Sequence, residues 1–147
     1  MFKMKINKIF LDTFIILIIF LMDRISKIYI LEIAKLETKV DIYVNSYLNF
    51  YLIWNKGTAF GLFSFDESFI YQSISLIVFI ICIGVIIMII KSKGLKKYAL
   101  ILVLGGALGN FFDRMYYSAV PDFIDFHIGN FHWFIFNVAD IFITIGV

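Results

Sequence analysis

The sequence predicts an all-α integral membrane protein: a four-transmembrane-helix bundle with a small extracytoplasmic β-sheet and a cytoplasmic N-terminus. Two observations predict this fold class. Of the 147 residues, 62% are hydrophobic and 16% are charged, whereas soluble domains are about half apolar and about a quarter charged. The apolar residues gather into four long runs, which leaves too few polar residues to cover a soluble surface. We expect residues 1–147 to form a single membrane domain.

The four apolar runs define the expected spans. A helix crosses the hydrocarbon core, roughly 30 Å thick, with about 20 mostly apolar residues. The last run has about 14 residues, which reach only about 21 Å in a helix. This span therefore packs against its neighbours without crossing fully, or the chain is truncated. The expected spans are residues 9–30, 69–90, 98–116 and 134–147.

Lysine residues set the expected orientation. They precede the first span and fill the short connection between the second and third spans, where no acidic residue accompanies them. Cytoplasmic segments carry an excess of lysine and arginine, so the outer segments, residues 31–68 and 117–133, should be extracytoplasmic. The lysines are Lys3, Lys5, Lys8, Lys91, Lys93, Lys96 and Lys97.

Charge distribution argues against a nucleic-acid-binding protein, and cysteine content excludes an internal disulfide. The net charge is +2, but the basic residues are scattered around apolar runs rather than gathered into a patch, which argues against nucleic-acid binding. Cys82 is the single cysteine, so an internal disulfide is excluded.

The outer segments are predicted to contain short strands. Residues 47–54 and 122–128 are rich in aromatic and β-branched side chains, which is typical of strands. Gly129-Asn130 indicates a turn, and Pro121 suits the first residue of a strand or a sheet edge. His127 and His132 are candidate bases or ligands, but in this aromatic segment we expect them to lie at the membrane interface.

Asp140 is the strongest candidate for chemistry. It lies in the last apolar run, with no Lys or Arg after it. Burial without a cation disfavours the ionised form, so this carboxyl must be protonated or must share a proton. Aspartic peptidases use such a pair: one ionised carboxyl activates water and the protonated one polarises the scissile carbonyl. The alternative is a structural Asp140 that only hydrogen-bonds within the bundle.

Three aspartates are candidate partners for Asp140. Asp113 is followed directly by Arg114, whose charge favours the ionised form, so we expect a structural or orienting ion pair there. Asp122 has apolar neighbours and no adjacent cation. Asp125 lies on the opposite face of the same predicted strand and can point to the core only if Asp122 does not. Asp122 is therefore the preferred partner.

Two asparagine patterns accompany these carboxyls. The spacing Asn-x-x-Asp occurs at Asn110 to Asp113 and at Asn137 to Asp140, and on a helix it places amide and carboxylate on one face. The group Asn55-Lys56-Gly57-Thr58-Ala59-Phe60-Gly61 combines an amide with small residues that permit close backbone approach. By itself this group indicates an ordinary loop.

Five motifs, in this order and at this spacing, make the chain resemble the bacterial lipoprotein signal peptidases, also called signal peptidase II. The resemblance extends over nearly the whole chain. The motifs are Asp23-Arg24-Ile25-Ser26-Lys27, Asn55-Lys56-Gly57-Thr58-Ala59-Phe60, Gly105-Gly106-Ala107-Leu108-Gly109-Asn110-Phe111-Phe112-Asp113-Arg114, Pro121-Asp122-Phe123-Ile124-Asp125-Phe126 and Phe136-Asn137-Val138-Ala139-Asp140.

The resemblance implies a multi-pass peptidase of the bacterial cytoplasmic (inner) membrane, with its active site toward the extracytoplasmic face. The implied reaction is aspartic proteolysis, without metal or cofactor, of diacylglyceryl-modified prolipoproteins just before the lipidated cysteine. The implied partners are these prolipoproteins and membrane lipids, and the enzyme is expected to be a globomycin-sensitive monomer.

The resemblance also implies roles for individual residues. The catalytic pair falls on Asp122 and Asp140, and a mobile element that closes over the substrate would begin at Asn55. Pro121 departs from the family, which commonly has a second valine there, and removes a backbone donor next to Asp122. Substrate-binding or orienting roles fall on Asn55, Gly57, Asn110, Arg114 and Asn137, and supporting roles on Asp23, Lys27 and Asp113.

The alternative function is a small proton- or cation-coupled membrane transporter subunit. Its carboxylates should be spread through the depth of the membrane along a pathway. Here they cluster toward one face, apart from Asp12. A scaffold whose charges are all structural is a third interpretation.

Overall fold

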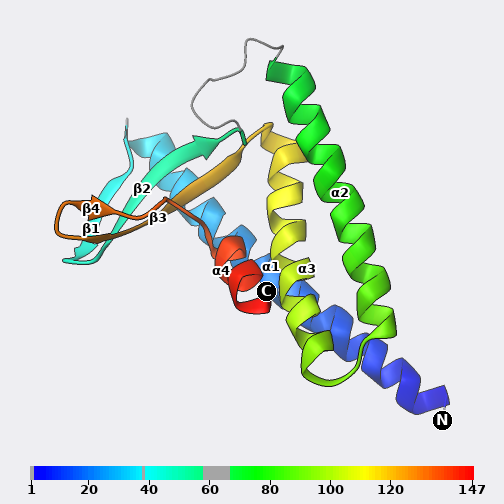
Figure 1. The fold of residues 1–147 in the computed structure, drawn as a ribbon. Helices are drawn as coiled ribbons and strands as arrows, with labels where there is room; N and C mark the ends of the chain where they lie inside the picture. Colours follow the sequence, from blue (N-terminus) through cyan, green and yellow to red (C-terminus); the bar gives the residue numbers. More distant parts are fainter. Residues whose placement is uncertain (1, 38, 58–66) are drawn as a thin grey trace.

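The chain is mostly helical and carries a small antiparallel sheet near one end of its long helices (Figure 1). The structure is a computed structural model that describes residues 2–37, 39–57 and 67–147, with side chains described for 8–37, 39–57 and 71–147. Its elements are α1 (Phe2–Leu36), β1 (Asp41–Asn45), β2 (Leu48–Asn55), α2 (Glu67–Lys91), α3 (Gly94–Tyr117), β3 (Val120–Ile128), β4 (Phe131–His132) and α4 (Val138–Gly146).

The helices follow the four predicted apolar runs, with different ends. Within the described residues, Tyr71–Lys91 and Gly94–Tyr117 are long and apolar enough to cross a membrane. Helix α1 is longer, at 35 residues, but carries charged side chains in its middle, and α4 has 9 residues. The predicted number of crossings, four, therefore stays a prediction.

Helix α3 packs closely against its neighbours through glycines. A Cβ atom at Gly105 would lie 2.8 Å from Ile19 of α1. A Cβ atom at Gly146 of α4 would lie 2.5 Å from the carbonyl oxygen of Ala99. Such approaches exclude any side chain, and they explain why small residues occur where membrane helices touch.

The sheet has the strand order β1-β2-β3-β4, with every pair antiparallel. Strands β2 and β3 confirm the predicted strands at residues 47–54 and 122–128, while β1 and β4 were not predicted. Gly129 adopts a φ of 59° in the turn between β3 and β4, as its turn signal indicates. Pro121 is the second residue of β3 and pairs with Trp54 of β2; β4 reaches only His127 and Ile128. At Pro121, therefore, β3 pairs with β2 but not with β4. A proline, which has no backbone N–H to donate, is tolerated at such a position.

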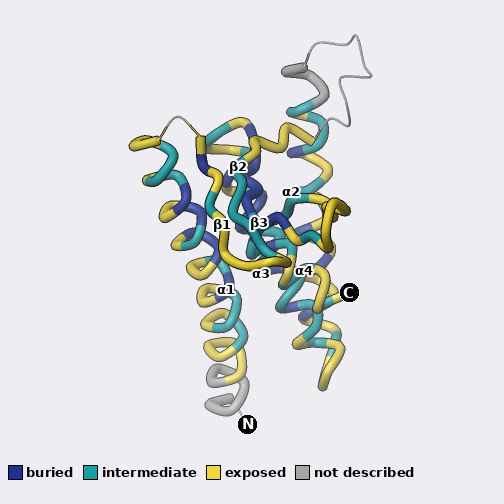
Figure 2. The backbone as a smooth tube through the Cα atoms, turned by 90° about the vertical axis from the view of Figure 1, so that its left-hand side faces the viewer, coloured by how far each residue is buried: buried dark blue, intermediate teal, exposed yellow. Residues whose placement is uncertain are grey.

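Exposed residues recur along α1 and α2 (Figure 2), and many of them are large and aliphatic. Ile80 is 58% exposed and Ile90 is 77% exposed. Water-soluble proteins rarely expose contiguous apolar surfaces of this kind. The surface suits contact with lipid.

Candidate active site

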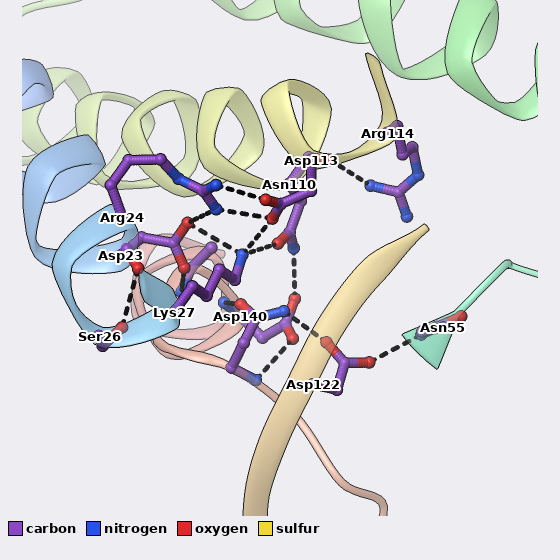
Figure 3. Close-up of polar contacts among 12 residues, drawn as sticks. Asp23, Arg24, Ser26, Lys27, Asn55, Asn110, Asp113, Arg114, Asp122 and Asp140 are labelled. Carbon is purple, nitrogen blue, oxygen red and sulfur yellow. Dashed lines mark hydrogen bonds and ion pairs between the residues drawn. The ribbon is translucent and has the colours of Figure 1, made fainter. Parts of the chain in front are cut away.

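Polar side chains from five elements meet where α1, α3 and α4 approach β3 and the end of β2 (Figure 3). Every residue assigned a site role from the sequence lies in this cluster or at its border. The residues Thr58, Ala59, Phe60 and Gly61 of the second motif lie outside the described part of the chain. The cluster contains Asp23, Lys27, Asn110, Asp113, Asp122, Asn137 and Asp140, and its border contains Asn55, Gly57 and Arg114.

Asn137 links the two predicted catalytic carboxyls. Its Nδ2 atom donates to Asp122 Oδ1 over 2.6 Å, and its backbone N–H donates to Asp140 Oδ2 over 3.1 Å. Its Oδ1 atom accepts from the backbone N–H of Asp140, which completes a capping box at the start of α4. Because this bond fixes the amide oxygen toward the helix, the NH₂ group must point at Asp122.

Asp140 therefore lies in the first turn of α4, not one or two turns inside a span that starts at residue 134. The helix begins at Val138 and Asn137 is its N-cap. A carboxylate is favoured at this end, where the free backbone N–H groups and the helix dipole are positive. The expectation that Asn137 and Asp140 share a helical face is thus corrected: together they cap the helix.

Asp122 projects from β3 and is bound by two amides. Asn55, at the end of β2, donates its Nδ2 to Asp122 Oδ2 over 2.9 Å. The backbone N–H of Gly57 donates to Asn55 Oδ1 over 2.8 Å, which orients the amide as at Asn137. The φ of Gly57, 77°, is one that glycine adopts without strain.

A side-chain amide from α3 binds Asp140. Asn110 donates its Nδ2 to Asp140 Oδ1 over 2.8 Å. The Lys27 ammonium donates to Asn110 Oδ1 over 2.8 Å. An ammonium has donors only, so it selects the orientation of this amide.

A buried ionic cluster supports the site from α1 and α3. Lys27 bonds to Asp23 over 2.9 Å and to Asp113 over 2.6 Å, and Arg24 pairs with the same two carboxylates. Asp23 also accepts the backbone N–H of Ala139 over 3.0 Å, which fixes the start of α4. Arg24 received no role from the sequence, although its place beside Asp23 within an apolar run was a signal for one.

The cations that pair with Asp113 differ from the expected one. Arg114, its sequence neighbour, donates to the backbone oxygen of Asn110 over 3.0 Å. Lys27 and Arg24 of α1 neutralise Asp113 instead. Successive residues on a helix point in directions about 100° apart, so Arg114 faces away from the cluster that Asp113 enters.

The environment of Asp122 differs from that of the ion-paired aspartates. Asp122 is 2% exposed, and its carboxylate accepts hydrogen bonds from the amides of Asn55 and Asn137. Burial raises the pKa of the Asp122 carboxyl above its usual range, and repulsion from Asp140 adds to this, while the bonds from Asn55 and Asn137 oppose it. A buried carboxyl of raised pKa next to a second carboxyl is suited to sharing a proton.

Asp125 corrects a second expectation. It is 5% exposed, so both aspartates of β3 are buried, although only one of the two was expected to point to the core. Asp122 meets the helices, whereas Asp125 bonds to His132 of β4 over 2.9 Å. The partner of Asp125 thus comes from the unpredicted strand β4, which pairs with β3.

The described carboxylates do not form a pathway through the helices. Asp12 pairs with Lys97 about 16 Å from Asp23 along α1. The other buried carboxylates gather at the site described above and at the neighbouring hairpin. This arrangement favours a localised active site over the transporter alternative.

Comparison with known proteins agrees with this geometry. A family model described as signal peptidase (SPase) II matches residues 15–147. The lipoprotein signal peptidase of Pelagibacter ubique (strain HTCC1062) is 54% identical over 145 residues, which cover 99% of this chain and 87% of that protein. That of Francisella tularensis subsp. novicida (strain U112) is 43% identical over 116 residues, which cover 76% and 72%.

Solved structures show the same fold. One bacterial membrane enzyme, solved at 2.3 Å resolution, superposes with a TM-score of 0.74 at 33% identity over 92% of this chain and 81% of its own. Another, solved at 1.9 Å resolution, gives a TM-score of 0.76 at 31% identity over 92% and 86%. The chain therefore belongs to the signal peptidase II family, the lipoprotein signal peptidases.

Proposed function

We propose that Asp122 and Asp140 are the catalytic pair with which the chain removes signal peptides from diacylglyceryl-modified prolipoproteins, cleaving just before the lipidated cysteine. The observation that carries this proposal is the double contact of Asn137. One residue donates to both carboxyls, through its side chain and its backbone. Two carboxyls held this way, one on β3 and one on α4, face the same space (Figure 3).

The proposed reaction uses the pair as one acid and one base. The ionised carboxyl takes a proton from a water molecule, whose oxygen attacks the scissile carbonyl carbon. The protonated carboxyl donates to the carbonyl oxygen and stabilises the charge that develops there. The carboxyl that took the proton from water then gives it to the leaving amide nitrogen as the carbon–nitrogen bond breaks. The tetrahedral intermediate returns one hydroxyl proton to the other carboxyl as the new carboxyl group forms, so the pair ends with one shared proton, as it began.

The surrounding residues would hold this pair and the peptide in place. Lys27 acts through Asn110 as a positioning residue, because it points the NH₂ group of that amide at Asp140. Asp23 and Asp113 fix Lys27 in turn. Residues at the border would contact the substrate backbone, which needs both donors and acceptors. These are Asn55, Gly57 and Arg114.

We also propose the membrane placement that lysine distribution indicates. The N-terminus and the α2–α3 connection lie at one end of the molecule, away from the sheet (Figure 1). That end carries the lysines near the N-terminus and around the α2–α3 connection, which supports a cytoplasmic location. The sheet and the aspartates would then face the extracytoplasmic side of the bacterial inner membrane. Four helical segments in one monomer, surrounded by lipid, complete this proposal.

Processing of a lipid-modified prolipoprotein in vesicles tests the catalytic assignment. Asp122→Asn and Asp140→Asn should each abolish cleavage while the protein remains folded. Asp41→Asn is the matched control, because Asp41 is exposed on β1 and forms an ion pair with the exposed Lys39. Full processing by both catalytic variants would refute the assignment. Inhibition by globomycin provides an independent check on the substrate class.

A further inference from the structure

A second cluster of titratable side chains lies in the β3–β4 hairpin. Asp125 and His127 are two residues apart on β3, so they project from the same face. His132 of β4 is the cross-strand partner of His127. Asp125 follows Asp122 by about 10 Å along the strand, which separates this cluster from the proposed catalytic pair.

The ligand atoms of these three side chains converge. His132 Nδ1 lies 2.9 Å from Asp125 Oδ2, and His127 Nδ1 lies 3.8 Å from the same oxygen. The two imidazole rings stack with centroids 5.0 Å apart. One ligand atom from each of the three residues lies within 4.8 Å of the others.

His127 is the residue that the ion pair between Asp125 and His132 does not explain. Its Nδ1 atom is buried and neither donates nor accepts a hydrogen bond among the described residues. Buried polar atoms without a partner are rare in native structures and call for an explanation. Here the orphan nitrogen points at a carboxylate that is too distant for a hydrogen bond but close enough to share a ligand with it.

We propose that Asp125, His127 and His132 bind a divalent transition-metal ion, with zinc as the reference case. Zinc bonds to imidazole nitrogen and carboxylate oxygen are about 2.0–2.2 Å long, so tetrahedral ligand atoms lie about 3.4 Å apart. The measured separations of 2.9 and 3.8 Å bracket this value.

The donor set selects the class of metal. Two imidazoles favour zinc, cobalt, nickel or copper over calcium and magnesium, which prefer all-oxygen sites. The His132 side chain is 54% exposed, which gives an ion access from solvent and leaves the fourth position to water. Binding through Nδ1 of His132 would require that this nitrogen carries no proton, and the ion would replace its hydrogen bond to Asp125.

A metal at this position would cross-link the two strands of the hairpin. On one side β3 carries Asp122, and on the other the chain runs from β4 to Asn137 and Asp140. Further along this path the two segments are joined by the hydrogen bond from Trp133 N–H to the Phe126 oxygen and by the bridge between Ile124 and Phe136. The ion would therefore hold together the segments that present the two aspartates, while taking no part in the chemistry.

Metal binding to the full chain, purified without a polyhistidine tag, tests the proposal. Both histidines of the protein lie in this cluster, so the visible absorption of histidine-bound Co²⁺ reports this site alone. We expect one Co²⁺ per chain, displaced by Zn²⁺, and a higher melting temperature with Zn²⁺. His127→Gln and His132→Gln should each weaken binding at least about tenfold, since even outer-shell partners of metal ligands contribute 10–100-fold.

Two controls make the outcome decisive. Asp41→Asn and Cys82→Ser should bind as the native protein does, because neither residue lies in the cluster. If His132→Gln destabilises the metal-free protein, His127→Gln decides, because its Nδ1 has no hydrogen bond to lose within the described structure. Absence of Co²⁺ and Zn²⁺ binding at micromolar concentration, or binding unchanged in His127→Gln, would overturn the proposal.

Discussion

The Lys27 ammonium donates a hydrogen bond to the Oδ1 atom of Asn110 over 2.8 Å. A lysine of α1 thereby decides which end of an α3 amide faces the Asp140 carboxylate. Both Lys27 and Asn110 are buried, so the amide orientation cannot be exchanged cheaply for contacts with water. The hydrogen bond from Asn110 to Asp140 therefore depends on Lys27 as well as on Asn110.

Replacing Asn110 by Asp tests this dependence. The change keeps the side-chain shape and the bond to Lys27. It replaces the NH₂ group that donates to Asp140 with a carboxylate oxygen, which cannot donate. We expect kcat to fall at least about 100-fold, the size of effect seen when one preorganised donor is removed from an active site. Cleavage of a lipid-modified prolipoprotein measures it. Asn45→Asp on β1 is the control, and unchanged turnover by a folded Asn110→Asp variant would contradict the prediction.

The pH profile of cleavage should respond to Asn55. Burial raises the pKa of Asp122, and the hydrogen bond from Asn55 lowers it. Removing that bond in Asn55→Ala should raise the pKa further, so the pair keeps its shared proton to higher pH. The alkaline limb of the kcat/KM profile should therefore move to higher pH.

Asn45→Ala is the matched control for this experiment. Asn45 accepts the backbone N–H of Tyr47, two residues on, as Asn55 accepts that of Gly57. Each asparagine forms a turn of the same kind, but Asn55 also binds Asp122. A shift of the alkaline limb to lower pH, or the same shift in both variants, would argue against the assignment.

Asp113 should matter first for stability. It is fully buried and bonds to Arg24 and Lys27, so Asp113→Asn leaves two buried cations with one carboxylate. Breaking a buried ion pair by removing one partner costs about 3–5 kcal/mol of unfolding free energy. Denaturation in detergent micelles measures this loss. Glu32→Gln, which breaks an exposed pair with Lys35, should change stability little, and equal losses would refute the distinction.

Gly109 should tolerate no side chain. A Cβ atom there would lie 2.5 Å from Asp23 Oδ2, the carboxylate that also holds the start of α4. Gly109→Ala should therefore lower both the melting temperature and the cleavage rate. Gly84→Ala is the control, since no described atom lies within 4 Å of a Cβ atom there. It should be neutral or stabilising by up to about 1 kcal/mol, because alanine is the better helix former.

Much of the fold was predictable because apolar runs and segments rich in aromatic and β-branched residues favour helices and strands within the segment itself. Strands β2 and β3 were found this way. Strand β1 is short and mostly exposed, and β4 has two residues whose extended conformation comes from pairing with β3. Neither leaves a periodic signal in the sequence. The contact between Asp125 and His132 of β4 was missed with that strand.

The two Asn-x-x-Asp patterns separate what each level of structure contributes. The sequence alone determined that both pairs lie in apolar helical regions and that an unneutralised carboxylate there requires a partner. It assigned an ion pair to Asp113 and the chemistry to Asp140, but it did not show that Asn110 to Asp113 lies inside α3 while Asn137 to Asp140 caps α4. The cations of Asp113 come from α1, 86 and 89 residues away. Only the tertiary structure brings these groups within hydrogen-bonding distance, and in a buried site that distance decides which carboxyls are neutralised by cations and which are bound by amides.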